Sequence, residues 1–472
     1  MTETSGRIDR STMLALVAMG LGVFVIANDF TALSVAIPNI EKALHTGLTK
    51  SQWVINGYAL VFGVLIVTGG RLADMFGRKR VFMIGSAIFA AFSLAAGLMP
   101  TVVPLILCRG AMGIGGALMW PAILGMTYGL LPEAKAGLAG GLIIGVAGIG
   151  NAVGPLLGGF LTDELSWRWV FFLNLPVTAF AVLVTYRLVH ETTVPTTERR
   201  IDYPGIAVLS GGIVAILIAL DQGSEDGFGK PAILALFAVG FVLLGSFLVV
   251  ERRQGSGALV PSEVLRNRVF SGAALAVLLM SAIFFAALLY LPQFFEKELQ
   301  FSALRSGAGL LPLMVVFAIT SFVAGPLYER LGPRIVVTAG AACLAIGIFV
   351  LSFLDADTKY VALVPGMAVL GVGVGLFYSS ITTVAVTALD PSQSSLAGGI
   401  VYMCQIAGGA VGLGLNTAIV TSQSSLSDGI SIAFKVDAGL AVVGFLVALV
   451  VLGQHEPVTP AASLRTHHRA HA

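Results

Sequence analysis

A short charged loop reads Gly70-Arg71-Leu72-Ala73-Asp74-Met75-Phe76-Gly77-Arg78-Lys79-Arg80. It carries four cations and one carboxylate, and it lies between two apolar runs that are each long enough to cross a bilayer. A buried core helix would not tolerate that charge density at its end. Positive loops between membrane helices are typical of the cytoplasmic side. The stretch therefore predicts a membrane protein with this loop in the cytoplasm.

The composition excludes an ordinary soluble domain. Of the 472 residues, 57% are hydrophobic and 11% are charged, whereas soluble domains carry about 25% charged residues. Because so apolar a chain cannot cover itself with polar surface, we expect the bilayer to be its solvent. The net charge of +2 gives no indication of a partner, and no basic cluster is large enough to predict nucleic-acid binding.

Fourteen apolar stretches are long enough for a membrane span of about 20 residues. They are residues 12–37, 52–70, 81–99, 102–128, 136–161, 168–189, 203–221, 231–250, 269–292, 306–327, 334–354, 360–387, 394–421 and 433–453. With the N-terminus inside, most of the 27 lysines and arginines fall in the cytoplasmic segments. We therefore expect a multi-pass protein of the cell membrane with both termini in the cytoplasm. Trp53, Trp167 and Trp169 are expected in an outer aromatic belt.

The chain repeats itself. Leu138-Ala139-Gly140-Gly141 returns as Leu396-Ala397-Gly398-Gly399, and Ala152-Val153-Gly154 returns with the same spacing as Ala410-Val411-Gly412. The charged loop returns in weaker form at Gly325–Arg334, where Glu329 replaces Asp74. Shared spacing of this kind indicates duplicated six-helix units, which is a known transporter architecture.

We therefore predict an all-α polytopic membrane fold of two six-helix bundles with two extra central helices. The expected units are a first bundle in residues 1–190, two inserted helices in 191–265, a second bundle in 266–455 and a cytoplasmic tail in 456–472.

Asp29 is the one carboxylate that we place well inside a predicted span, about 13 Å deep at 1.5 Å per residue. An acidic side chain at that depth is costly and usually functional. A carboxylate that can take up a proton near neutral pH is a natural proton carrier. The alternative is a structural hydrogen bond to a neighbouring helix. Its repeat mate is Ala287, so the two halves are expected to differ in function.

Arg109 is the one cation deep in a span, at nearly the same depth as Asp29. A guanidinium cannot lose its proton to escape the membrane, so it needs a partner. Asp29 is one candidate, and backbone carbonyls or water are others. We interpret Arg109 as a group that stabilises the ionised form of Asp29 in one conformation and releases it in another. The alternative is a static pair that holds two helices together. Its repeat mate is the uncharged Met367.

Two further motifs predict conformational devices. In the loop, Gly70 and Gly77 allow a tight turn, Asp74 can accept hydrogen bonds from a helix N-terminus or pair with an arginine of the other half, and Arg78 and Lys79 can hold helix C-termini. This pattern favours a cytoplasmic latch, with a purely topological positive loop as the alternative. A second segment is rich in small residues, which allow close helix packing. We predict that this segment acts as a pliable gate between the halves. Its marked positions are Gly150, Gly154, Pro155, Gly158 and Gly159.

A set of polar and aromatic residues within the spans is predicted to line a central substrate cavity. These residues are Asn56, Trp120, Asn151, Tyr378, Tyr402, Gln405 and Asn416. Each is also compatible with simple helix packing. We expect no metal site and no cofactor, and we expect the three cysteines to form no disulfide.

These motifs together resemble the major facilitator superfamily, and within it the fourteen-helix drug:proton antiporters, over essentially the whole chain. Gly70–Lys79 resembles the loop between helices 2 and 3, and Arg109–Ala117 resembles the helix 4 motif, although Met112 stands where glutamine is often found. Gly150–Gly159 resembles the helix 5 motif regarded as the antiporter signature, and Asp29–Pro38 the helix 1 motif. Ala219–Gly223, after helix 7, also resembles this subgroup.

The resemblance implies a transporter, not an enzyme, in which proton influx drives efflux of small amphipathic compounds by alternating access. It implies roles in proton transfer for Arg109 and in coupling for Asp29, and we expect a functional monomer. Some relatives that export divalent cations carry a further membrane carboxylate in the second half. We expect none here, which favours neutral, zwitterionic or monocationic substrates.

Three alternatives stay open. The same fold can export an endogenous metabolite, a siderophore or a lipid. It can serve as a transporter-like sensor or scaffold that moves nothing, which the motifs in both halves disfavour. Uptake by symport is disfavoured by the helix 5 motif.

Overall fold

The computed structural model describes residues 9–191, 201–227, 229–254 and 258–452. Within these ranges the chain is built of helices, and fourteen of them are long and apolar enough to span a membrane. This confirms the predicted fold class and number of spans. The predicted tail in residues 456–472 lies outside the described residues.

The first six-helix unit comprises α1 to α6. Their bounds are α1 Arg10–Leu44, α2 Leu48–Phe76, α3 Arg78–Leu98, α4 Val102–Leu130, α5 Ala136–Glu164 and α6 Trp169–Leu188. The second unit repeats this order with the helices α10 Arg268–Lys297, α12 Leu311–Leu331, α13 Pro333–Leu351, α14 Tyr360–Thr387, α15 Ser394–Thr421 and α16 Leu426–Leu452. The short helix α9 Ser262–Arg266 precedes α10, and the short helix α11 Ala303–Gly309 lies between α10 and α12.

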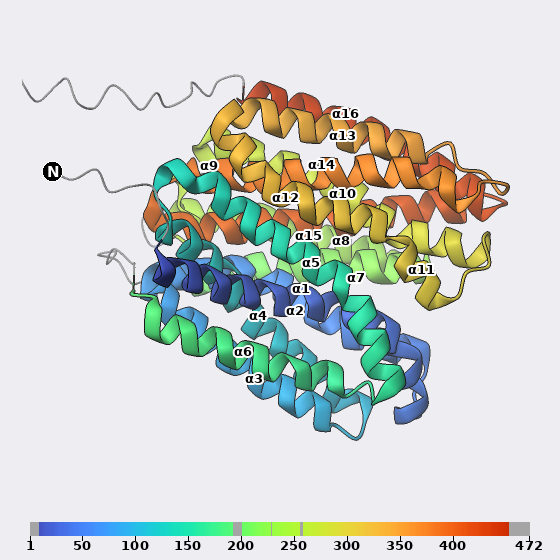
Figure 1. Ribbon diagram of the computed structural model, residues 1–472, viewed down its shortest axis with the longest axis horizontal. Coiled ribbons are helices and arrows are strands. Elements are labelled where there is room, and N and C mark those ends of the chain that lie inside the picture. Colours follow the sequence, from blue (N-terminus) through green and yellow to red (C-terminus); the bar gives the residue numbers. More distant parts are fainter. Residues whose placement is uncertain (1–8, 192–200, 228, 255–257, 453–472) are drawn as a thin grey trace, which may run out of the picture.

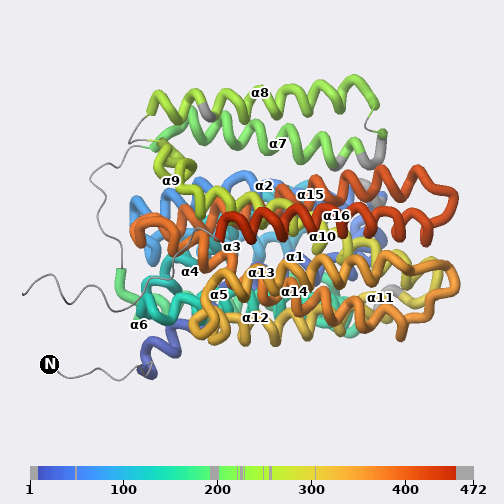
Figure 2. The backbone as a smooth tube through the Cα atoms, turned by 90° about the horizontal axis from the view of Figure 1, so that it is seen from above, coloured from blue at the N-terminus to red at the C-terminus, as the bar shows by residue number. Residues whose placement is uncertain are grey.

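The insert consists of α7 Tyr203–Asp226 and α8 Pro231–Gln254. Only α7 of this pair makes extensive contacts with the rest of the described chain, to α2 of the first unit and α15 of the second. In Figure 2 the pair therefore lies along one side of the body, with α8 outermost. The insert thus covers the seam between the two halves.

The helices lie roughly side by side, so that loops gather at two ends of the bundle (Figure 1). We call these ends the Asp74 end and the Trp53 end, because these residues lie near opposite ends of α2. Helix α1 begins and α16 ends at the Asp74 end (Figure 1). An even number of spans places both there.

Small residues set how closely the helices pack. A Cβ added to Gly113 of α4 would lie 2.7 Å from the Tyr58 carbonyl oxygen of α2, and one added to Gly371 of α14 would lie 2.5 Å from the Leu313 carbonyl oxygen of α12. These glycines are repeat mates, and they sit at equivalent helix crossings in the two halves. The duplication predicted from the sequence is therefore present in the packing.

Candidate functional site

Asp29 and Arg109 form an ion pair in the interior of the first unit. The Arg109 Nη1 donates to Asp29 Oδ2, and both side chains are completely buried. Asp29 is on α1 and Arg109 is on α4, so the pair joins two helices that are not neighbours in sequence. Of the partners considered from the sequence, the structure thus contains the carboxylate and, as shown next, one backbone carbonyl.

Arg109 has further neighbours that compensate its burial. Its Nε donates to the Val54 carbonyl oxygen of α2 at 2.8 Å, and its guanidinium lies 4.3 Å from the centroid of the Tyr58 ring. Cation–π contact with a desolvated guanidinium is worth about 2 kcal/mol. Removing one partner of such a buried pair costs about 3–5 kcal/mol, because the other charge is left uncompensated.

The other carboxylate oxygen of Asp29 is held by an asparagine that we did not predict. The Asn174 Nδ2 of α6 donates to Asp29 Oδ1 at 3.1 Å and to Ser93 Oγ of α3 at 3.1 Å. Ser93 Oγ in turn donates to the Phe171 carbonyl oxygen at 2.8 Å. A lone amide or hydroxyl in an apolar run gives little sequence signal, since it is as typical of helix packing as of a site. This network fixes the orientation of Asp29.

The charged loop contacts the second half of the molecule. Asp74 Oδ2 accepts from the Leu396 backbone N–H at 2.8 Å, and Oδ1 accepts from that of Ser395 at 3.3 Å. Both residues lie in the first turn of α15, where free N–H groups and the helix dipole favour a carboxylate. Asp74 therefore binds a helix N-terminus across the two halves. Its arginine partner is Arg78 of the same loop, at 3.0 Å, and not a residue of the other half.

The cations of the loop bind helix ends nearby. Arg78 is buried and donates to carbonyl oxygens of Gly125 and Pro391, the former at 3.0 Å. Lys79 Nζ donates to the Tyr186 carbonyl oxygen in the last turn of α6 at 2.8 Å. Gly77 has a φ of 111° between α2 and α3, which explains the glycine at this turn.

The weaker copy of the loop makes the equivalent contact in the opposite direction. Glu329 Oε1 accepts from the Leu138 backbone N–H in the first turn of α5 at 3.3 Å. Leu138 is the repeat mate of Leu396, which Asp74 binds. Each half thus holds the N-terminus of a helix in the other half, but the first contact is buried and the second is exposed.

The glycines of α5 divide between two neighbours. A Cβ on Gly141 would approach the Ser321 carbonyl oxygen of α12 to 2.7 Å, so this part of the helix faces the other half. Added Cβ atoms on Gly154 and Gly158 would instead meet Thr31 and Ala32 of α1 at 3.0 Å or less. The predicted gate segment, residues 145–159, therefore faces both neighbours. A Cβ on Gly145 or Gly148 would meet Phe322 or Phe317 of α12 at 2.9 Å or less, whereas the positions from Gly150 onward pack against α1. Its role as a gate stays a prediction.

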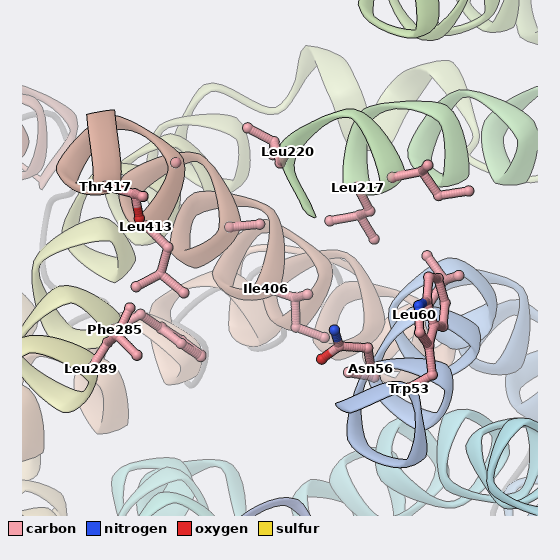
Figure 3. A pocket seen from close by; sticks show the side chains of 14 residues that line it. Trp53, Asn56, Leu60, Leu217, Leu220, Phe285, Leu289, Ile406, Leu413 and Thr417 are labelled. Carbon is pink, nitrogen blue, oxygen red and sulfur yellow. The ribbon is translucent and has the colours of Figure 1, made fainter. Parts of the chain in front are cut away.

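Of the residues predicted to line a cavity, some line the cavity that the structure contains and others do not. A cavity of about 330 Å³ lies toward the Trp53 end between α2, α7, α10 and α15 (Figure 3). Asn56 lines it, together with Trp53, which we had assigned to an aromatic belt. The predicted residues Trp120, Asn151, Tyr378, Tyr402 and Gln405 are absent from its lining.

Three of these residues pack against neighbouring helices instead. Trp120 is buried with its ring centroid 4.3 Å from that of Tyr402, so these aromatic rings pack against each other between α4 and α15. The Tyr378 hydroxyl is hydrogen-bonded to Ser281 at 3.0 Å and is also buried. Their size and partial polarity serve packing between helices. The remaining lining is mostly apolar and comes from α2, the insert and the second half, with Thr417 of α15 as a polar exception (Figure 3).

The structure also corrects our view that Asp29 is the one carboxylate deep in a span. Asp437 of α16 is completely buried, and Asn416 donates to it at 3.1 Å. Asn416, which we expected in the cavity lining, is therefore engaged with this carboxylate. The argument against dicationic substrates, which assumed no membrane carboxylate in the second half, no longer holds. In the part of the chain that the structure describes, no three His, Cys, Asp or Glu side chains are grouped to hold a metal ion.

Comparison with known proteins agrees with this architecture. The sequence profile of the Major Facilitator Superfamily matches residues 19–318 and 313–471. Among solved structures, the human organic anion transporter MFSD10 (TETRAN) superposes with a TM-score of 0.67, covering 93% of this chain and 99% of that one at 13% identity. This likeness concerns the fold alone.

Several curated relatives are resistance or export proteins. The puromycin resistance protein pur8 of Streptomyces alboniger is 34% identical over 86% of this chain and 81% of its own length. The cephamycin export protein CmcT of Amycolatopsis lactamdurans is 30% identical over 96% of this chain and 93% of its own. The multidrug resistance protein Stp of Mycobacterium tuberculosis is 31% identical over 88% and 76%. With its fourteen spans and duplicated halves, the chain belongs to the Major Facilitator Superfamily of membrane transporters.

Proposed function

We propose that this protein exports small amphipathic compounds across the cytoplasmic membrane in exchange for protons, by alternating access. The observation that carries the proposal is the buried Asp29–Arg109 pair in a transporter fold whose curated relatives are named for drug resistance and antibiotic export. A membrane carboxylate of this kind is a natural place for a transported proton.

The pair offers a direct mechanism for coupling. With Asp29 ionised, the carboxylate ties α1 to α4 through Arg109 and to α6 through Asn174. A proton on Asp29 removes the negative charge and weakens the first tie, while Arg109 keeps the Val54 carbonyl and the Tyr58 ring as partners. The proton therefore changes how firmly α1 is held.

Helix α5 is placed to carry that change to the other half. One set of its glycines packs against α12, and another packs against α1 at Thr31 and Ala32, within one turn of Asp29. A shift of α1 therefore acts directly on a helix that lies on the interface between the halves. Population shifts of this kind need only differential contacts in the two states.

Two features of this conformation support an orientation of the protein in the membrane. The Asp74 latch is closed, and the cavity lies toward the Trp53 end. We propose that the Asp74 end is cytoplasmic, in keeping with its positive loop, so that this conformation faces outward. The hydrogen bonds of Asp29 all come from residues of one chain, which supports function as a monomer.

Transport in proteoliposomes tests the proposal. We expect a substrate such as a planar cationic dye to collapse an imposed pH gradient in wild-type vesicles, and not in Asp29→Asn vesicles. The exposed Asp163→Asn is the matched control, since it also removes an acid of the first unit but lies at the end of α5. Full coupled transport by Asp29→Asn would contradict the role of Asp29.

A second candidate function is export of an endogenous metabolite. It is favoured by the relative named as a cephamycin exporter, which aligns over nearly the whole of both chains. A deletion strain separates the two. Accumulation of a self-made compound with unchanged drug sensitivity supports the metabolite, and increased drug sensitivity supports drug efflux.

A further inference from the structure

Asp437 is buried in the second half without any described ion-pair partner. It lies eleven residues into α16, about 16 Å along the helix from the Trp53 end. The Asn416 Nδ2 donates to Asp437 Oδ1 at 3.1 Å and to the Gly412 carbonyl oxygen at 2.8 Å. Since a carbonyl oxygen only accepts, the second bond fixes which end of the Asn416 amide is nitrogen.

Two oxygens of this acid–amide pair lack a donor. Asp437 Oδ2 and Asn416 Oδ1 are both buried and have no hydrogen-bond partner. An ionised carboxylate and an amide oxygen are both acceptors, so neither can satisfy the other. A proton on Asp437 Oδ2 turns one of these two unsatisfied acceptors into a donor. Buried polar groups without partners are rare, which favours the protonated acid over the carboxylate.

In the part of the chain that the structure describes, no cation forms an ion pair with Asp437. The helices packed against α16 are α10, α13 and α15. Their titratable side chains are Arg268, Tyr290, Glu296 and Lys297 of α10, Arg334 and Cys343 of α13, and Tyr402 and Cys404 of α15. The charged members of this set lie at helix ends. Tyr290 is uncharged at neutral pH and lies on α10, which packs against α16. Lys435, two residues before Asp437 on α16, is exposed.

Tyr290 links α10, which packs against α16, to the wall of the cavity. Its hydroxyl is hydrogen-bonded to Thr417 Oγ1 at 2.7 Å, and Thr417 lines the cavity (Figure 3). Asn416 is adjacent to Thr417 in α15, so the acid–amide pair is the layer directly behind this wall of the cavity. Two hydroxyl groups can pass a proton by donating on one side and accepting on the other.

We propose that Asp437 is a second protonation site, which carries a proton in this conformation and exchanges it with the cavity through Tyr290 and Thr417. In this step a hydrated proton from the cavity adds to the carboxylate and gives the neutral acid, with no redox partner. The coupling role of Asp437 rests on the proposed function as a proton-driven exporter. The protonation of Asp437 in this conformation does not rest on that function.

Infrared spectroscopy of the full chain in lipid tests the protonation. We expect the wild type at neutral pH to show the C=O stretching band of a protonated, buried carboxyl. Asp437→Asn should remove this band, while Asp29→Asn and the exposed Asp428→Asn of the same helix should keep it. A spectrum unchanged by Asp437→Asn overturns the proposal. If that variant does not fold, Asn416→Ala gives the same test, because loss of the amide should shift the band.

The route and the coupling have separate readouts. Thr417→Val keeps the shape of the side chain, and we expect it to slow exchange of the Asp437 proton with D2O several-fold while the band stays. Unchanged exchange overturns the route. Asp437→Asn should lower the number of protons exchanged per substrate, and an unchanged number overturns its coupling role. If the wild type moves no protons at all, the proposed function is wrong. The infrared band still shows whether Asp437 is protonated.

Discussion

In each half of the molecule a carboxylate is buried beside an asparagine, but the two carboxylates have different further partners. In the first half Asp29 faces Arg109, and in the second half the repeat mate of that arginine is Met367. Asp437, on α16, accepts from an amide and forms no ion pair within the described residues. The comparison teaches that duplication preserved the backbone and the helix crossings while the charges diverged, so equivalent positions in the two halves cannot be assigned equal roles.

The asparagines come from different helices, which shows how the second pair is built. Asn174 lies on α6, whereas Asn416 lies on α15 at the repeat position of Gly158. In the first half Gly158 allows α5 to approach α1, since a Cβ there would lie 2.1 Å from the Ala32 carbonyl oxygen. In the second half the position instead carries the amide that reaches Asp437. Close packing in one half is replaced by a polar contact in the other.

Arg109→Met makes the first half like the second and should have the largest effect. It leaves the buried Asp29 without its cation, so we expect a loss of stability of about 3–5 kcal/mol and loss of proton-coupled transport. Thermal unfolding in detergent and dye transport measure the two effects. Adding Asp29→Asn should restore most of the stability but not the transport, because it removes the uncompensated charge. Wild-type stability in the single variant would contradict the importance of the pair.

The two latch loops allow a second comparison. Asp74→Asn removes the charge that pairs with buried Arg78, and we expect turnover to fall roughly tenfold because the inward–outward balance shifts. Glu329→Gln is the matched control, and it should change turnover about twofold or less, since Glu329 is exposed and makes one described bond. Normal turnover in Asp74→Asn would reduce the loop to a topology signal.

The sequence alone identifies those charged residues that stand out against an apolar background. Asp29 and Arg109 stand out as charges inside long apolar runs, and the loop stands out as a cluster between them. Asp437 is not predicted, because the hydrophobic pattern places the start of the last span at residue 433. Asp437 then falls near the expected end of the span, beside Lys435, whereas α16 begins at Leu426. The carboxylate therefore lies about two helical turns deeper than the hydrophobic pattern indicated.

The cavity could not be predicted for a different reason. Its lining includes Leu217 and Leu220 of α7, and the position of the insert over the seam depends on tertiary packing. The insert has no repeat mate, so the duplication gives no guide to where it lies. Trp120 and Tyr402 were plausible cavity residues by type, and only their mutual contact shows that they belong to the packed interface.

Asn174→Leu tests how much of the Asp29 site depends on its amide. It removes the bonds to Asp29 Oδ1 and Ser93 Oγ, so we expect a loss of about 1–2 kcal/mol of stability, with substrate binding kept. Ser93→Ala is the control, because it removes the bonds of Ser93 to Asn174 and to the Phe171 carbonyl but keeps the bond to Asp29, and it should cost less. Chemical unfolding in detergent compares them. Equal costs would show that the bond to Asp29 itself contributes little.

Trp53→Phe should have the smallest effect and should act on substrate alone. Trp53 lines the cavity and is half-buried, so a smaller ring leaves the helices in place but reduces contact with planar aromatic substrates. We expect weaker binding by a few-fold and unchanged thermal stability, measured by fluorescence titration and unfolding. Trp120→Phe is the converse case. Its ring packs against Tyr402 between the halves, so it should lower stability more than it changes binding. The reverse pattern would move the substrate site from the cavity beneath α7 to the interface between α4 and α15.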